Sequence, residues 1–277
     1  MRFTANWHTH NFRCRHASGD FAEYARAAIG AGIGVLGISD HSPTPDNRDI
    51  GVRMFRDELA GYISGFHAAK ELFPSLRMHL GLELEYFEDI MPGWADELRG
   101  EGIEYLAAAP HFFTLADGSM VNPWLPAPRE DRPRFLAAYG EFVVKMIASG
   151  RYAFVAHPDL FGCFCSEWLP ECDTLAREVA AAARDTGTPL EINAAGFYHR
   201  WIGLPDGGRR PPYPWEPFWR IVAESGATVI INSDAHVPEA IAKSVGDAFG
   251  LAGRCGIRPA TFTDVAGGRL SSPLPND

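Results

Sequence analysis

Two stretches of the chain decide its fold. Residues 3–10 read Phe-Thr-Ala-Asn-Trp-His-Thr-His, and residues 35–41 read Val-Leu-Gly-Ile-Ser-Asp-His. Each is a short, mainly apolar run that ends in chemically reactive side chains, and a longer stretch with helical periodicity follows each one. A strand followed by a helix is the repeating unit of a parallel sheet.

The same alternation continues along the chain of 277 residues. Seven strands are predicted, at 3–8, 35–40, 78–86, 105–111, 154–157, 190–193 and 228–233. Helices are predicted near 20–31, 54–73, 92–100, 131–149, 173–186, 215–225 and 238–252. We therefore expect an α/β protein in which parallel strands and crossover helices close into a barrel-like sheet, and the length allows one domain.

Composition narrows the function classes. The chain has 25 Lys and Arg against 35 Asp and Glu, a net charge of −10, and its basic residues are scattered. Nucleic-acid binding is therefore disfavoured. The N-terminus lacks a charged segment followed by an apolar core, and no apolar run reaches about 18 residues. We expect a soluble, cytoplasmic protein that does not act at a membrane; the oligomeric state leaves no signal.

The cysteines predict no disulfide framework, because their number is odd in a long chain. They stand at positions 14, 163, 165, 172 and 255. The pair Cys163 and Cys165 lacks the two-residue spacer and the second pair of a thiolate metal site. Reduced thiols in loops or partly buried positions are expected.

Histidines and carboxylates gather where the predicted strands end. In βα barrels the loops open on that face, so catalytic groups stand there. His8 and His10 are two residues apart, which puts both on one side of an extended chain. The other donors are Asp40, His41, Glu83, Glu85, His111, His157, Asp234 and His236, with His16 in the first loop. A mixed set without sulfur predicts a site for Zn, Mn or Fe.

Each of these residues alone has a structural alternative. Asp40 and His41 could form a cap or a turn, and His111 or His157 could be a hydrogen-bonded core histidine. The conjunction of five strand ends favours a metal cluster. By contrast His67 lies mid-helix and residue 79 lies early in its strand, so structural roles are expected for both histidines.

The motifs resemble those of the polymerase-and-histidinol-phosphatase (PHP) superfamily, in the same order and over about residues 6–240. They are His8-Thr9-His10, Ser39-Asp40-His41, Gly81-Leu82-Glu83, Pro110-His111, Ala156-His157-Pro158 and Ser233-Asp234-Ala235-His236. Four further stretches are similar to the histidinol-phosphatase branch. They are 12–19, 39–43, 190–196 with Leu190-Glu191-Ile192-Asn193, and 212–214. The resemblance implies a distorted (βα)7 TIM-like barrel, with residues 1–277 forming a single PHP-type phosphoesterase domain.

The resemblance also implies an allocation of two to three divalent metal ions. His8, His10, Glu83 and Asp234 would hold the first, Glu83 would bridge to a second held by His111 and His157, and the third would bind His16, His41 and His236. Glu85 is expected either to support a ligand or to be a surface acid.

The chemistry implied is hydrolysis of a phosphomonoester. A metal-bridging hydroxide, held by Glu83 and its neighbours, would attack phosphorus while the metals neutralise the phosphate. Asp159, His199 or a metal-held water could protonate the leaving oxygen, and the sequence does not choose among them.

Substrate contacts are predicted from the loops. Arg13, Arg15 and Arg200, with Arg209 and Arg210, are candidate phosphate clamps or else solvent-facing arginines. Tyr198 and Trp201 stand where the branch usually has a short apolar residue and a basic pair, and they could contact the substrate. With Trp124, Trp215 and Trp219 they could form an aromatic wall, or simply pack the loops.

The leading hypothesis is a metal-dependent phosphatase acting on L-histidinol phosphate in histidine biosynthesis. A PHP phosphoesterase with another substrate, such as a nucleotide, a cyclic phosphate or a specialised-metabolism phosphate ester, uses the same residues. A non-catalytic or proofreading PHP module is disfavoured because the ligand set is complete. An amidohydrolase-like enzyme is disfavoured because Lys70, Lys145 and Lys243 all lie away from strand ends.

Overall fold

Seven parallel strands form the central sheet of the protein. The computed structural model describes residues 2–49, 51–199, 201–204 and 206–275. The strands are β1 Ala5–Asn6, β2 Val35–Ile38, β3 Arg77–Glu85, β4 Tyr105–Ala109, β7 Phe154–Val155, β8 Leu190–Asn193 and β11 Val229–Asn232. Neighbouring strands of the sheet follow one another in this order. All seven predicted strands are present.

Contacts between the first and last strands nearly close the sheet. Thr9 and Ala235 form a parallel bridge just beyond β1 and β11, and the backbone N–H of His10 donates to the carbonyl of Ala235 at 2.9 Å. The N–H of Trp7 donates to the side-chain oxygen of Asn232 at 2.8 Å. The prediction of an α/β, TIM-like barrel is therefore confirmed.

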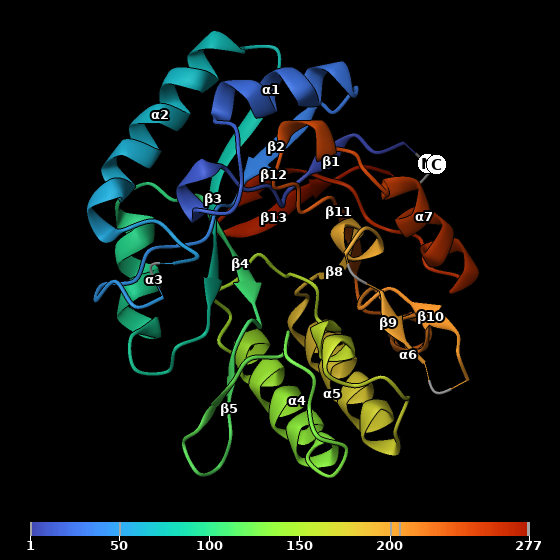
Figure 1. The fold of residues 1–277 in the computed structure, drawn as a ribbon. Helices are drawn as coiled ribbons and strands as arrows, with labels where there is room; N and C mark the ends of the chain where they lie inside the picture. Colours follow the sequence, from blue (N-terminus) through green and yellow to red (C-terminus); the bar gives the residue numbers. More distant parts are fainter. Residues whose placement is uncertain (1, 50, 200, 205, 276–277) are drawn as a thin grey trace.

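Seven helices follow the strands and cover the outside of the sheet (Figure 1). They are α1 Phe21–Gly30, α2 Leu59–Leu72, α3 Met91–Gly100, α4 Arg132–Ala148, α5 Pro170–Thr186, α6 Glu216–Ser225 and α7 Val245–Arg254. Asp20 begins α1 with a capping box closed by Glu23. The last helix begins later than predicted, because residues 238–240 form a separate 3-10 turn before it.

Three antiparallel hairpins were not predicted. They pair β5 Phe113–Thr114 with β6 Met120–Val121, β9 Ile202–Gly203 with β10 Arg209–Arg210, and β12 Phe262–Ala266 with β13 Arg269–Pro273. The last hairpin covers the N-terminal end of the barrel, where the indole N–H of Trp7 donates to the Phe262 carbonyl and Arg77 donates to the Thr263 carbonyl.

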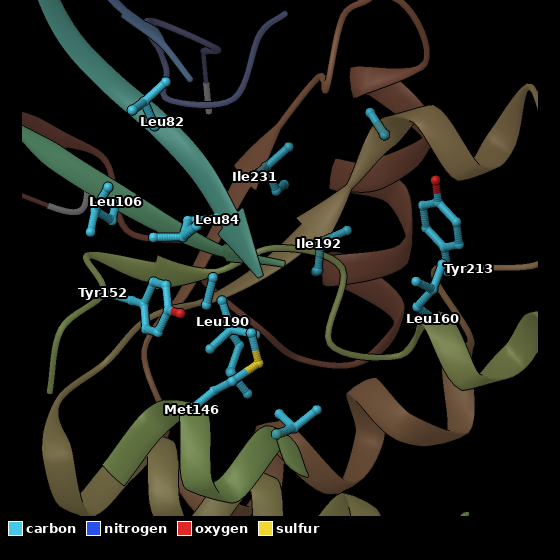
Figure 2. Close-up of a cluster of buried hydrophobic side chains, with 14 of the residues drawn as sticks. Leu82, Leu84, Leu106, Met146, Tyr152, Leu160, Leu190, Ile192, Tyr213 and Ile231 are labelled. Carbon is cyan, nitrogen blue, oxygen red and sulfur yellow. The ribbon is translucent and has the colours of Figure 1, made fainter. Parts of the chain in front are cut away.

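Two apolar clusters fill the molecule. The larger packs the outer face of the sheet against the helices; Figure 2 shows part of it, with Leu82, Leu84 and Ile192 from the strands and Met146 from α4. The smaller fills the barrel interior; it contains Ala5, Trp7, Val35, Tyr105, Ala107, Ala153, Phe154, Ala156, Ile230 and Leu270. These clusters pack the strands against one another and against the helices. All strand ends that carry a predicted metal ligand therefore lie at one end of the barrel, here called the rim.

The cysteines lie deeper than expected, because Cys14, Cys165 and Cys172 are buried and Cys172 is part of α5. All five cysteines are free. Within the described residues, no helix is both long enough and apolar enough to cross a membrane.

Candidate metal centre

The nine predicted metal ligands meet at the C-terminal ends of the strands, and six of the seven strands contribute. They are His8, His10, His16, His41, Glu83, His111, His157, Asp234 and His236. All except His8 line one cavity of about 560 Å³, and His8 is fully buried behind it. The barrel thus gathers residues that lie more than 200 positions apart in the chain.

Glu83 lies at the centre of the cluster. Its Oε1 is 3.2 Å from Nε2 of His157, 3.4 Å from Nε2 of His8 and 3.6 Å from Nε2 of His111. Its Oε2 is 3.0 Å from Nδ1 of His41. One carboxylate therefore faces imidazoles from four other strands, an arrangement that suits a ligand shared between two ions.

Asp234 faces a second group of imidazoles. Its Oδ1 is 2.9 Å from Nε2 of His10, 3.4 Å from Nε2 of His8 and 3.5 Å from Nδ1 of His236. The Nε2 atoms of His8 and His10 are 3.1 Å apart. Two adjacent imidazoles and a carboxylate that point to one place form an ordinary divalent metal site.

The outermost group consists of His16, His41 and His236, whose ligand atoms lie within 4.8 Å of one another. Nδ1 of His16 is 2.8 Å from the Cys14 carbonyl, and Nδ1 of His236 is 3.0 Å from the Asp234 carbonyl. A proton on each Nδ1 satisfies these carbonyls and leaves Nε2 as the free lone pair. The two Nε2 atoms are 3.2 Å apart.

Several buried atoms of the cluster have no hydrogen-bond partner. They are Oε2 of Glu83, Oδ1 of Asp234, and Nδ1 of His10, His41 and His157. Buried polar atoms normally have a partner, so the unpartnered carboxylate oxygens of Glu83 and Asp234, which face the imidazoles of the cluster, fit a bound cation. The donor set fits divalent metal ions.

The cluster also shifts the pKa values of its members. Burial alone would raise the pKa of Glu83, but the imidazoles of His111 and His8 hold it well below its usual range. Burial lowers the pKa of His41 well below normal and that of His236 to about 3. Burial opposes protonation of His8 and His10 as well, yet the surrounding carboxylates raise their pKa values well above normal. A metal ion that binds these two imidazoles would therefore displace protons.

Two of the ligands have a backbone conformation that side chains other than glycine rarely adopt. The φ angles of His157 and Asp234 are 30° and 51°. Strained residues of this kind concentrate at functional sites, where the surrounding structure holds them in place. The backbone N–H of His157 donates to Oε2 of Glu191 at 3.0 Å, which supplies part of that support.

Glu191 is a supporting residue whose role the sequence reasoning missed. Its Oε1 is 2.8 Å from Nδ1 of His8 and from the amide of Asn232, and its Oε2 accepts from the amide of Asn193 at 2.8 Å. Its contact with Nδ1 orients Nε2 of His8 toward the cluster. The sequence did contain a signal for this role, because Glu191 and Asn193 alternate with apolar residues along a short strand.

Glu85 supports a second ligand through a buried chain of contacts. Its Oε1 is 3.0 Å from Nδ1 of His111, and its Oε2 accepts from Arg53 at 2.8 Å. Arg53, which the sequence reasoning also missed, is fully buried and donates to the Ser42 carbonyl. Glu85 is therefore a buried partner of His111 and not a surface acid.

The outer part of the cavity is largely aromatic. Its described lining residues are Val52, Phe112, Asn122, Trp124, Tyr198, His199 and Tyr213. Trp201 is exposed and lies outside this lining, while Trp215 and Trp219 are buried in the core. The aromatic wall thus contains Trp124 and Tyr198 but not the other three predicted residues.

The candidate phosphate clamps lie elsewhere. Arg13 pairs with Asp20 at 2.8 Å, and Arg15 pairs with Glu58. Arg210 donates to backbone carbonyls, including that of Pro212, at 3.0 Å. Among the described lining residues none is Arg or Lys; the prediction for Arg200 lies outside the described residues.

The two candidate proton donors differ in position. His199 lines the cavity, and burial lowers its pKa. Asp159 lies outside the described lining, where its Oδ2 accepts from the N–H of Trp215 at 2.5 Å and from the indole of Trp219 at 2.9 Å. Burial raises the pKa of Asp159 to about 7.

The remaining histidines have the positions expected of structural residues. His67 is exposed on α2. His79 is buried, with Nδ1 at 2.7 Å from Oε2 of Glu104 and its ring against Trp7.

Comparisons with known proteins agree with this architecture. A "Probable histidinol-phosphatase" of Deinococcus radiodurans is 29% identical over 264 residues, which cover 92% of this chain and 95% of that protein. The crystal structure of a histidinol phosphate phosphatase from Lactococcus lactis, in complex with zinc, L-histidinol and phosphate, has a TM-score of 0.72. The match covers 98% of this chain and 100% of that one at 15% identity, so it supports the fold alone.

The family model of the PHP domain matches residues 6–195, which include seven of the nine candidate ligands. The remaining two, Asp234 and His236, lie after that segment and complete the cluster in the structure. The chain therefore belongs to the PHP domain family.

Proposed function

We propose that the protein hydrolyses L-histidinol phosphate to L-histidinol and phosphate. Membership of the PHP family and the histidinol-phosphatase relative make the chain a metal-dependent phosphatase. The observation that carries the proposal is the cluster of nine ligands with orphaned carboxylate oxygens on Glu83 and Asp234. It opens into a cavity large enough for a small phosphate ester. We expect this reaction to take place in the cytoplasm, as part of histidine biosynthesis.

The proposed ligands would hold two to three divalent ions, Zn, Mn or Fe. His8, His10, Glu83 and Asp234 form the first set, Glu83, His111 and His157 the second, and His16, His41 and His236 the third. Bound ions supply charge neutralisation for a dianionic phosphate and acidified water for its hydrolysis.

The residues of the chain perform the remaining tasks. Glu191 and Glu85 orient His8 and His111, so that the ligand nitrogens point inward. His199 lies nearer the substrate than Asp159, but the lowered pKa of His199 leaves it neutral at pH 7. The variants His199→Gln and Asp159→Asn, tested separately, identify the proton donor. Loss of the donor should slow hydrolysis of an alkyl phosphate ester more than hydrolysis of p-nitrophenyl phosphate, whose leaving group needs no proton.

The test is phosphate release by protein loaded with Mn, Zn or Fe. We expect L-histidinol phosphate to be turned over with a kcat/KM of about 10⁴ M⁻¹s⁻¹ or more, well above a nucleoside monophosphate and a cyclic phosphodiester. Weak turnover with metals demonstrably bound would overturn this substrate and leave the phosphatase chemistry standing.

The outer cavity favours, as the second candidate, a phosphate ester whose alcohol part is an uncharged aryl or nucleoside group. Besides the proposed ligands Glu83 and Asp234, the described lining contains one carboxylate, Glu85, which is already paired with Arg53 and is a poor partner for the ammonium of histidinol. An aromatic lining can instead stack on a planar ring, or hold an ammonium through cation–π contacts. The same assay, extended to phenyl phosphate and to a nucleoside monophosphate, distinguishes the two candidates.

A further inference from the structure

One buried polar group in the cavity has no task in the scheme above. Tyr213 lines the cavity with only 1% of its surface exposed, and its hydroxyl has no hydrogen-bond partner. Its ring centroid lies 5.6 Å from that of the candidate ligand His157 and 5.8 Å from that of Trp124. The ring of Tyr213 therefore neighbours both a candidate metal ligand and the aromatic part of the cavity lining.

The other buried tyrosines provide a contrast. Tyr105 donates its hydroxyl to the Trp7 carbonyl at 2.8 Å, and Tyr139 donates to the Pro158 carbonyl at 3.0 Å. Tyr62 donates to the Gly81 carbonyl at 2.8 Å. A buried hydroxyl without a partner is costly, so its retention requires another explanation. In Figure 2 the hydroxyl of Tyr213 points away from Leu160 and out of the apolar cluster.

The backbone around Tyr213 holds the side chain in one position. The carbonyl of Pro212 accepts from Arg210 at 3.0 Å, and the N–H of Trp215 donates to buried Asp159. A Cβ atom on Gly196 would lie 1.9 Å from the Tyr213 carbonyl, so glycine is required there for the two segments to meet. Residues 212–215 are all buried. A hydroxyl on such a support is preorganised and does not reorient freely.

We propose that Tyr213 is a substrate-contacting residue whose hydroxyl donates a hydrogen bond to a phosphoryl oxygen of the bound ester. The described cavity lining contains no Arg or Lys that could bind a phosphoryl oxygen. The neutral hydroxyl of Tyr213, whose ring lies near His157, would supply such a hydrogen bond instead. Burial raises the pKa of Tyr213 well above its usual value, which keeps the phenol protonated over the working pH range. The inference rests on the proposed phosphatase function for its substrate class.

The test compares wild type with Tyr213→Phe, which removes only the hydroxyl. Tyr152→Phe is the matched control, because Tyr152 is buried in the apolar cluster behind the sheet and its hydroxyl contacts only the sulfur of Met91. The proteins are loaded with Mn, and their metal content is measured. Calorimetry then gives the affinity of each for inorganic phosphate.

We expect Tyr213→Phe to weaken phosphate binding by about 10- to 100-fold, the range for one hydrogen bond to a charged group. The kcat/KM for p-nitrophenyl phosphate and for L-histidinol phosphate should fall by similar factors. The metal content and the Tm should stay unchanged, or the Tm should rise, because an unpartnered hydroxyl has been removed. A structural role would lower the Tm instead.

Three outcomes would overturn the assignment. One is phosphate affinity in Tyr213→Phe within about twofold of wild type, and another is an equal loss in Tyr152→Phe. The third is the absence of phosphate binding by the metal-loaded wild type. If wild type binds phosphate but hydrolyses no ester, the proposed function fails while the calorimetric comparison still decides the role of Tyr213.

Discussion

The rim of the barrel, at the C-terminal ends of the strands, and the barrel interior below it contain different kinds of residues. At the C-terminal ends of the strands, imidazoles and carboxylates face one another, and buried atoms of Glu83 and Asp234 have no hydrogen-bond partner. The interior below is apolar, and the hydroxyl of Tyr105 donates to the Trp7 carbonyl. The interior therefore stabilises the fold, whereas the rim carries groups that only a ligand can satisfy.

Substitution of candidate metal ligands at the rim should have the largest effect on activity. We expect Asp234→Asn and His10→Ala to reduce phosphate release by about a thousandfold or more, because each removes a ligand from the cluster. Their Tm values in the absence of metal should change little, since neither side chain belongs to the apolar core. Phosphate release and thermal unfolding of the metal-free proteins measure the two quantities.

The control for these variants is His67→Ala, on the exposed face of α2, which should keep turnover within a few-fold of wild type. Comparable activity in all three variants would contradict the proposed site.

A smaller effect should follow when a supporting residue of the rim is changed. Glu191→Gln keeps the shape of the side chain but alters the acceptor that Nδ1 of His8 contacts. We expect metal affinity to fall by about 10- to 100-fold, as for other residues that orient a ligand. Titration with Mn or Zn under competition from a chelator measures this, with the exposed Glu178→Gln as the matched control. Unchanged affinity would limit Glu191 to a packing role.

A substitution in the barrel interior should instead lower stability and leave metal affinity unchanged. In Gly37→Ala, the new Cβ would lie 2.2 Å from the hydroxyl of Tyr105 and 3.0 Å from Cα of Trp7. We expect the free energy of unfolding to fall by about 1–3 kcal/mol, while metal affinity per folded molecule is retained. Gly61→Ala in α2, where a Cβ meets nothing within 4 Å, should stabilise by about 0.5–1 kcal/mol. Denaturant unfolding and metal titration would show an interior coupled to the rim if both quantities fell together.

A further effect should be a pH dependence of the free energy of unfolding that originates at Asp159, beside the rim. Burial raises the pKa of Asp159 from 3.8 to about 7, so between these values the folded protein holds a proton that the unfolded chain releases. The free energy of unfolding should therefore fall as pH rises from 4 to 7, by up to about 1.4 kcal/mol per pH unit. In Asp159→Asn this contribution disappears. Unfolding curves of both proteins at several pH values measure the difference; identical slopes would exclude a raised pKa.

Local pattern was enough to predict most of the fold. The apolar runs at β2 and β8 and the helical stretches between strands have periods that depend only on near neighbours, so they are legible in sequence. The positions of His41 and His157 at strand ends were legible for the same reason. Because the C-terminal ends of parallel strands share one side of the sheet, convergence of the ligands followed from the order of elements.

Other features depended on contacts between distant segments. Gly267 and Gly268, both with positive φ, form the two-residue turn between β12 and β13, and this pair was a hairpin signal that the sequence reasoning overlooked. That the hairpin covers the end of the barrel depends on contacts with distant residues such as Trp7 and Arg77. The sequence predicted Arg13 and Arg15 as candidate contacts of the substrate phosphate. In the structure they form ion pairs with Asp20 and Glu58 instead. Long flexible side chains find their partners only after folding, so their position in the sequence is a poor guide to their contacts.

The sequence by itself determined the strand order, the ligand types and their common face, because these follow from periodicity and from the geometry of a parallel barrel. Only the tertiary structure decided which groups support the ligands and which face the substrate. Glu191 contacts His8, and the ring of Tyr213 lies near those of His157 and Trp124, so each neighbourhood joins segments far apart in the chain. Such partnerships depend on distances of a few ångströms, which local sequence patterns do not specify.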